Sequence, residues 1–135
     1  MPPPSIRPQD EFRLDDHEVP PLAQVRTWIR EVLADLDPDF VADTELVATE
    51  LAANAFEHAK APRAIRLGRR DGVVRVEVDD AAPDLLPRPG RSTLGQFRGR
   101  GLVLIGSMGA DWGVDRSDDR KTVWAEIPDP NRRTP

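Results

Sequence analysis

Three polar side chains recur at regular spacing in the first half of the chain. Glu50, Asn54 and His58 are four residues apart, and residues at that spacing are neighbours on a helix surface. The amide oxygen of Asn54 suits a hard cation such as Mg²⁺, and the Glu50 carboxylate suits a general base. The alternative is that all three lie at the edge of an apolar stripe and contact water. His58 taken alone is more typical of a structural residue.

Two carboxylates end a valine-rich segment. Val74, Val76 and Val78 alternate with charged residues, which indicates a strand with one buried and one solvated face. By the same alternation Asp80 shares the valine face, and the Asp79 side chain points the other way. We therefore expect Asp80 to place a carboxylate at the edge of a buried face, and Asp79 to end the strand with a solvated charge.

A glycine-rich segment precedes a short apolar helix expected at 102–108. Gly99 and Gly101 would let backbone N–H groups approach a phosphate at the start of that helix. The spacing is not that of a dinucleotide-binding fingerprint, and there is no P-loop lysine. Between positions 88 and 100 there is no acidic residue, while four arginines occur: Arg88, Arg91, Arg98 and Arg100. This local positive charge suits a polyphosphate, and a solvated surface loop is the alternative.

Apolar periodicity predicts the elements that position these residues. A first helix begins near Pro21, with apolar side chains on one face at Leu22, Val25, Trp28, Ile29, Val32, Leu33 and Leu36. A second runs from about Asp43 to Ala59, with a stripe of Leu46, Val47, Leu51, Ala55 and His58. Strands are expected at 64–69 and 73–78, joined by an Asp71-Gly72 turn, and at 112–116 and 122–127, with a long loop at 84–100. This order predicts an α+β fold, a two-layer sandwich with helices on one face of a mostly antiparallel sheet.

Composition excludes several classes of function. The 135 residues include 19 basic and 24 acidic side chains and no cysteine, which excludes thiol catalysis, disulfides and cysteine metal sites. The acidic balance argues against nucleic acid as a direct partner. A basic run at Lys60, Arg63, Arg66, Arg69, Arg70 and Arg75 is taken as a solvated face. No stretch of about 18 apolar residues and no signal peptide is present, so we expect a cytoplasmic protein that does not bind membranes.

Taken in order, the motifs resemble those of the GHKL ATPases, the superfamily of gyrase, histidine kinases and MutL. Residues 50–59 resemble its N box, 76–83 its G1 box and 99–106 its G2 box. The size and the segment 121–126 are most similar to the anti-sigma factor serine kinases and their actinobacterial relatives. The resemblance implies a Bergerat-type ATP-binding domain at 12–128, with a disordered arm at 1–11 and a flexible tail at 129–135.

The resemblance also implies roles for individual residues. Asn54 would bind Mg²⁺, Glu50 would be the general base, and Asp80 would accept a hydrogen bond from the adenine amino group. Thr122 would support the adenine, through water. Arg98 or Arg100 would meet the γ-phosphate. The remaining expected cofactor-binding residues are His58, Ala82, Gly99, Gly101 and Leu102. Ala82 stands where the superfamily has glycine, which would narrow the adenine pocket.

The function that this resemblance implies is regulatory. The protein would bind Mg·ATP, sequester a sigma factor and act as an ATP-dependent serine kinase on a STAS-type antagonist. A non-catalytic, nucleotide-gated binding module and a simple ATPase are the alternatives. A homodimer through Phe12–Leu14 and the first helix is an open option.

Overall fold

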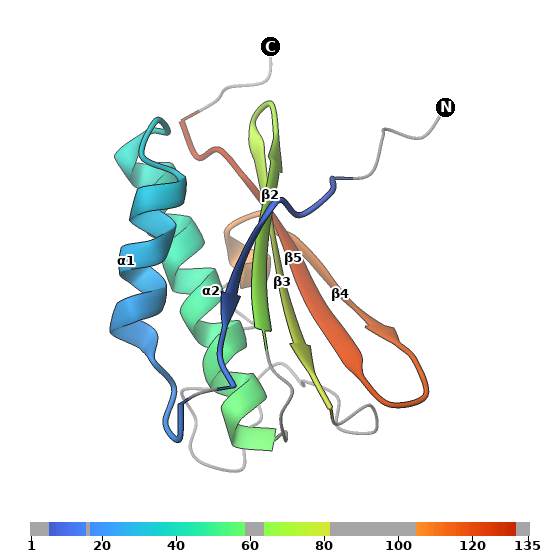
Figure 1. Ribbon diagram of the computed structural model, residues 1–135. Coiled ribbons are helices and arrows are strands. Elements are labelled where there is room, and N and C mark those ends of the chain that lie inside the picture. The colour runs from blue at the N-terminus through green and yellow to red at the C-terminus, as the bar shows by residue number, and fades with distance from the viewer. Residues whose placement is uncertain (1–5, 16, 59–63, 82–104, 132–135) are drawn as a thin grey trace.

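A computed structural model of the chain describes residues 6–15, 17–58, 64–81 and 105–131, without the side chains of residues 57 and 58. The elements are β1 (Asp10–Arg13), α1 (Leu22–Val32), α2 (Pro38–His58), β2 (Ala64–Arg70), β3 (Val73–Asp80), β4 (Asp111–Arg116) and β5 (Lys121–Pro128). The five strands form one antiparallel sheet in the order β1-β2-β3-β5-β4. Both helices lie side by side on one face of it (Figure 1), which confirms the predicted α+β sandwich.

The start of α2 differs from the prediction. The helix begins at Pro38, five residues before the expected start. Asp37 Oδ1 accepts a hydrogen bond of 2.8 Å from the backbone N–H of Asp39, and proline suits the first helical position because its missing N–H would have no helical partner there. Residues 38–42, which lie between the two predicted helices, therefore form the first part of α2.

One face of α2 packs on the sheet. Val47, Leu51 and Ala55 are buried in the core with the inward residues of β3 and β5. Leu46 was expected in this stripe and is instead 40% exposed, because consecutive helical residues are about 100° apart around the axis. None of the helices in the described part of the chain combines the length and the hydrophobicity that a membrane span requires.

The strands pair in a register that fixes the end of β3. The predicted turn joins β2 and β3, with Gly72 at a φ of 78°, a conformation that glycine adopts without strain. β3 also pairs with β5, and the final pair of that ladder is Asp80 opposite Lys121. As predicted, Val74, Val76 and Val78 are buried on the face toward the helices.

Residues 6–11 differ from the expected disordered arm. Ile6 is buried, the Gln9 N–H donates to the Leu67 carbonyl at 2.8 Å, and Asp10 and Glu11 belong to β1. At the other end, the Asp129 N–H donates to the Gly72 carbonyl at 3.0 Å. Both segments are therefore attached to the sheet.

Candidate functional site

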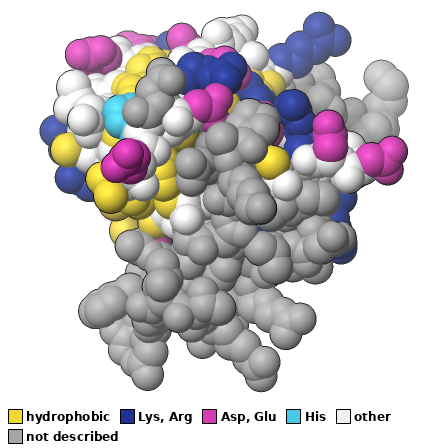
Figure 2. All heavy atoms as spheres, turned by 60° about the horizontal axis from the view of Figure 1, so that its bottom comes forward, with side chains coloured by type: hydrophobic (Ala, Val, Ile, Leu, Met, Phe, Trp, Pro, Cys, Tyr) yellow, Lys and Arg dark blue, Asp and Glu magenta, His cyan; other side chains and the backbone are white. Residues whose placement is uncertain are grey.

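A narrow pocket lies where α2 and β3 end and β5 begins. Its cavity volume is about 10 Å³, room for about one water molecule. Its walls are mostly apolar, and two charged side chains and one amide reach it. The lining residues are Leu51, Asn54, Ala55, Val78, Asp80, Lys121 and Val123. Figure 2 turns this end of the molecule toward the reader, and the hydrophobic side chains that it shows gather to one side of this end, beside a histidine.

The polar residues of α2 are placed by its buried stripe. Leu51 and Ala55 anchor the helix on the sheet, and Asn54, half-buried between them, lines the pocket. Glu50 is half-buried one turn earlier and is not among the lining residues. His58 is the last residue of α2, and its side chain is outside the described part of the structure. Of the three polar residues at four-residue spacing, the structure thus brings Asn54 to the pocket.

Asp80 lies on the inward face of β3, as predicted, and has a charged neighbour. Lys121 Nζ is 3.5 Å from Asp80 Oδ2, and the two side chains are 4% and 3% exposed. Burial lowers the pKa of the Lys121 ammonium, and the attraction of Asp80 offsets only part of that effect. The pocket therefore contains a buried ion pair at the junction of two strands.

Lys121 was missed by the sequence interpretation, and Thr122 was chosen in its place. Thr122 Oγ1 donates to Asp79 Oδ1 at 2.6 Å, on the face of the sheet that the helices leave open. Because side chains alternate along a strand, Thr122 and Lys121 lie on opposite faces. The expected support of the adenine by Thr122 does not match this placement, and Lys121 is the β5 residue beside Asp80.

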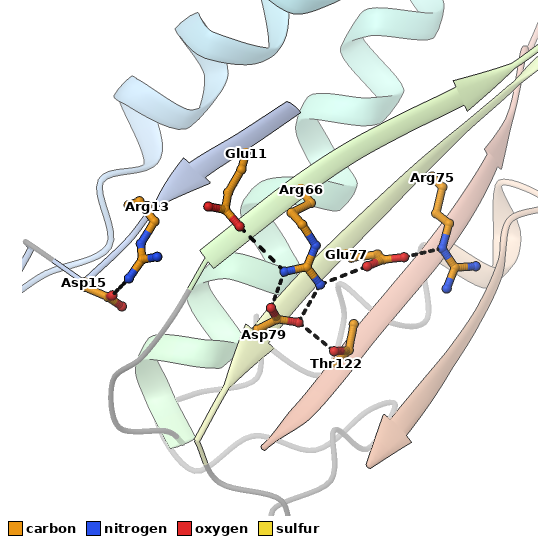
Figure 3. A network of polar contacts seen from close by, with 8 residues as sticks. All are labelled: Glu11, Arg13, Asp15, Arg66, Arg75, Glu77, Asp79 and Thr122. Atoms are coloured by element: carbon orange, nitrogen blue, oxygen red, sulfur yellow. Dashed lines mark hydrogen bonds and ion pairs between the residues drawn. The ribbon is translucent and has the colours of Figure 1, made fainter. Parts of the chain in front are cut away.

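Asp79 is not the solvated strand end that we expected. It is 7% exposed and belongs to a network on the open face of the sheet (Figure 3). Both Asp79 oxygens accept hydrogen bonds from Arg66, with Nη2 to Oδ1 at 2.8 Å. Burial opposes ionisation of the carboxyl, but the bonds from Arg66 and Thr122 outweigh it and lower the pKa of Asp79.

The same network extends along the sheet. Arg66 Nη2 also donates to Glu77 at 2.9 Å, and Arg75 joins Glu77 to Glu126. The Arg75 guanidinium lies 4.5 Å from the ring centre of Trp124. Arg66 and Arg75 were expected to be solvated and are instead half-buried in ion pairs. Ion pairs therefore link the side chains of β2, β3 and β5 on this face of the sheet.

The phosphate-contacting residues that we predicted lie outside the described residues. They are Arg98, Gly99, Arg100 and Gly101. The expected cofactor-binding residues Ala82 and Leu102 and the whole loop at 84–100 also lie outside the described residues. Of the expected helix at 102–108, residues 105–107 are helical, and Ile105 is buried against the core. The roles of these residues stay predictions.

A family model described as the histidine kinase-like ATPase domain matches residues 17–127. The chain belongs to this family. The match spans both helices, the pocket residues and strands β2 to β5. Among the expectations from the sequence, membership of the GHKL superfamily is thereby confirmed. The finer assignment to the anti-sigma factor serine kinases goes beyond this match. A search of curated proteins found no match.

Solved structures share the fold of this histidine kinase-like domain. The histidine kinase domain of an Erythrobacter litoralis blue-light activated kinase is 21% identical, with a TM-score of 0.51, over 79% of this chain and 58% of that one. The Acinetobacter baumannii histidine kinase AdeS is 12% identical, with a TM-score of 0.51, over 90% and 68%. Full-length ShkA in complex with AMPPNP is 21% identical, with a TM-score of 0.53, over 92% and 31%. The chain thus spans little more than half of the first of these structures.

Proposed function

We propose that this chain is an ATP-binding regulatory protein whose nucleotide binds in the pocket between α2, β3 and β5. The observation that supports this proposal is that Asn54 and Asp80, from a helix and a strand far apart in the sequence, line one pocket. An amide oxygen suits Mg²⁺, and a buried carboxylate suits an exocyclic amine. Membership of the histidine kinase-like ATPase family and the structural likeness to ShkA, solved with an ATP analogue, add to it.

The residues present fit a magnesium ion that is brought by the nucleotide. In the part of the chain that the structure describes, no cluster of three or more His, Asp or Glu side chains could hold a metal ion. Mg²⁺ at nucleotide sites is typically held by one or two protein ligands together with phosphates and water. Asn54 would be such a ligand, and the ion would neutralise charge on the phosphates.

The finer proposal is that the protein is an anti-sigma factor that also phosphorylates a serine on a STAS-type antagonist. The serine hydroxyl oxygen would bond to the γ-phosphorus, the bond to the leaving ADP oxygen would break, and Glu50 would take the hydroxyl proton. The likeness of residues 121–126 to those kinases supports this assignment. Arg98 or Arg100 would meet the γ-phosphate.

A non-catalytic, nucleotide-gated binding module is the second candidate. The specific observation in its favour is that Glu50 lies one turn from Asn54 and is not among the residues that line the pocket. In that case the nucleotide would set the shape of a partner surface, and no phosphate would be transferred.

Two measurements test these proposals in sequence. Calorimetric titration with Mg·ATP should show binding at millimolar nucleotide or below, and no binding would reject the ATP site. Incubation with γ-labelled ATP and STAS-type proteins from the same genome should then label a serine on one of them. Binding without any transfer would favour the binding module.

A further inference from the structure

We propose that Lys121 is a base-recognition residue, whose ammonium donates a hydrogen bond to the ring nitrogen N1 of adenine while Asp80 accepts from the neighbouring amino group. This inference rests on the proposed function, because it assumes that the nucleotide base enters the pocket. It assigns to Lys121 the place that we first expected for Thr122.

The strand register places the two groups side by side. Asp80 ends β3 and is directly opposite Lys121 at the start of β5. Both side chains point toward α2 and line the pocket, with Nζ and Oδ2 3.5 Å apart. The donor and the acceptor thus lie together between the apolar walls made by Leu51, Val78 and Val123.

This pairing matches the edge of an adenine ring. An ionised carboxylate can only accept hydrogen bonds, and an ammonium can only donate them. Adenine presents an amino donor at N6 next to an acceptor at N1, on the edge by which proteins often read an extruded base. One base can therefore satisfy both charged groups, and a pocket built to bond both atoms should reject an analogue that lacks one of them.

The burial of this pair is not explained by stability. Lysine is almost never fully buried without a partner, and a buried ion pair adds little net stability compared with apolar residues of similar size. The neighbouring inward residues of β5, Val123 and Ala125, are apolar. The pocket is also narrow, so an entering base must move side-chain atoms. Lys121 has the most rotatable side-chain bonds among the lining residues.

The test compares ATP with 1-deaza-ATP, in which a C–H group replaces N1 and the amino group is kept. Because hydrogen bonds to charged groups are the stronger ones, the wild-type protein should bind 1-deaza-ATP at least about tenfold more weakly than ATP. In Lys121→Met the two nucleotides should bind alike. Arg116→Met is the matched control, because Arg116 is an exposed cation directly opposite Lys121 in the β4–β5 ladder. Arg116→Met should keep the preference of the wild type for ATP over 1-deaza-ATP.

The outcomes separate this inference from the proposed function. If ATP does not bind, the proposed function fails and this inference fails with it. If the wild type binds ATP and 1-deaza-ATP equally, Lys121 forms an ion pair with Asp80 but does not bond to the base. That result would overturn this inference alone. Tighter binding of GTP than of ATP would also overturn it. The wild-type comparison decides the matter even if Lys121→Met does not fold.

Discussion

Asp79 and Asp80 are consecutive residues of β3, yet their carboxylates lie on opposite faces of the sheet. Asp80 faces α2 and lines the pocket, whereas Asp79 is held on the open face by Arg66 of β2 and Thr122 of β5 (Figure 3). The end of β3 is therefore tied to both neighbouring strands directly behind the carboxylate that we propose to bind the base.

Asp79→Asn should lower the free energy of unfolding at neutral pH by about 1–3 kcal/mol, because the buried charge-assisted bonds to Arg66 are weakened. The lowered pKa of Asp79 means that the folded protein binds fewer protons than the unfolded chain below about pH 4. Stability from this group is therefore present above that pH and is lost as the pH falls. In denaturant unfolding measured from pH 7 to pH 2, the free energy of unfolding should fall less steeply with decreasing pH in the variant than in the wild type.

The control for this prediction is Asp35→Asn. Asp35 pairs with Arg69 at 2.8 Å, but both side chains are largely exposed, and exposed pairs contribute little. This variant should unfold close to the wild-type denaturant midpoint at pH 7. An equal decrease in the free energy of unfolding in Asp79→Asn and Asp35→Asn would contradict a larger contribution of the Asp79 network to stability.

Asn54→Ala should remove most of the magnesium-dependent part of the stabilisation by ATP. A ligand that binds only the folded state raises the unfolding temperature more, the tighter it binds at a given concentration. Asn54 is the proposed protein ligand of the ion. The measurement is thermal unfolding with ATP, with and without Mg²⁺. Gln24→Ala removes an exposed amide from α1 and should behave as wild type. An undiminished magnesium effect in Asn54→Ala would place the ion elsewhere.

Glu50→Gln should separate binding from transfer. The amide keeps the shape of the side chain and loses the base, and general-base assistance is typically worth ~10²- to 10⁴-fold in rate. We expect near wild-type affinity for Mg·ATP by calorimetry and much slower labelling of an antagonist serine. Glu31→Gln changes an exposed carboxylate on α1. It is expected to leave both the affinity for Mg·ATP and the rate of labelling unchanged. If Glu50→Gln transfers phosphate as fast as wild type, Glu50 is a structural residue.

Gly68→Ala should loosen the segment before β1. A Cβ atom at Gly68 would lie 2.7 Å from the carbonyl oxygen of Arg7, so the backbone of residues 6–9 must move, at a cost of about 1–3 kcal/mol. Hydrogen exchange of residues 6–13 should speed up. At Gly106 no atom of the described residues lies within 4 Å of an added Cβ, so Gly106→Ala should leave this exchange as it is in the wild type.

Local patterns in the sequence were enough to predict four of the five strands and one side of the pocket, but not β1. The Asp71-Gly72 turn and the valine alternation gave the β2–β3 hairpin and the inward direction of Asp80. The same alternation, carried back along β5 from Val123, would have placed Lys121 inward. A lysine is not expected in a core unless its partner is known, and that partner, Asp80, lies on another strand.

The role of Asp79 could not be predicted from periodicity. Its partners, Arg66 and Thr122, come from two other strands, and only the register of all three brings them together. The early start of α2 could have been predicted, because Asp37 followed by Pro38 is typical of the beginning of a helix.

The segments that lead into β1 and out of β5 lie at the end of the molecule away from the pocket (Figure 1). Residues 6–9 run beside β2, and Asp129 bonds to the turn between β2 and β3, whereas Asp80 and Lys121 are at the opposite ends of their strands. A fluorophore, surface tether or fused domain attached beyond either segment would therefore leave the pocket accessible. Immobilisation through either segment would then allow single-molecule measurements of the proposed nucleotide binding.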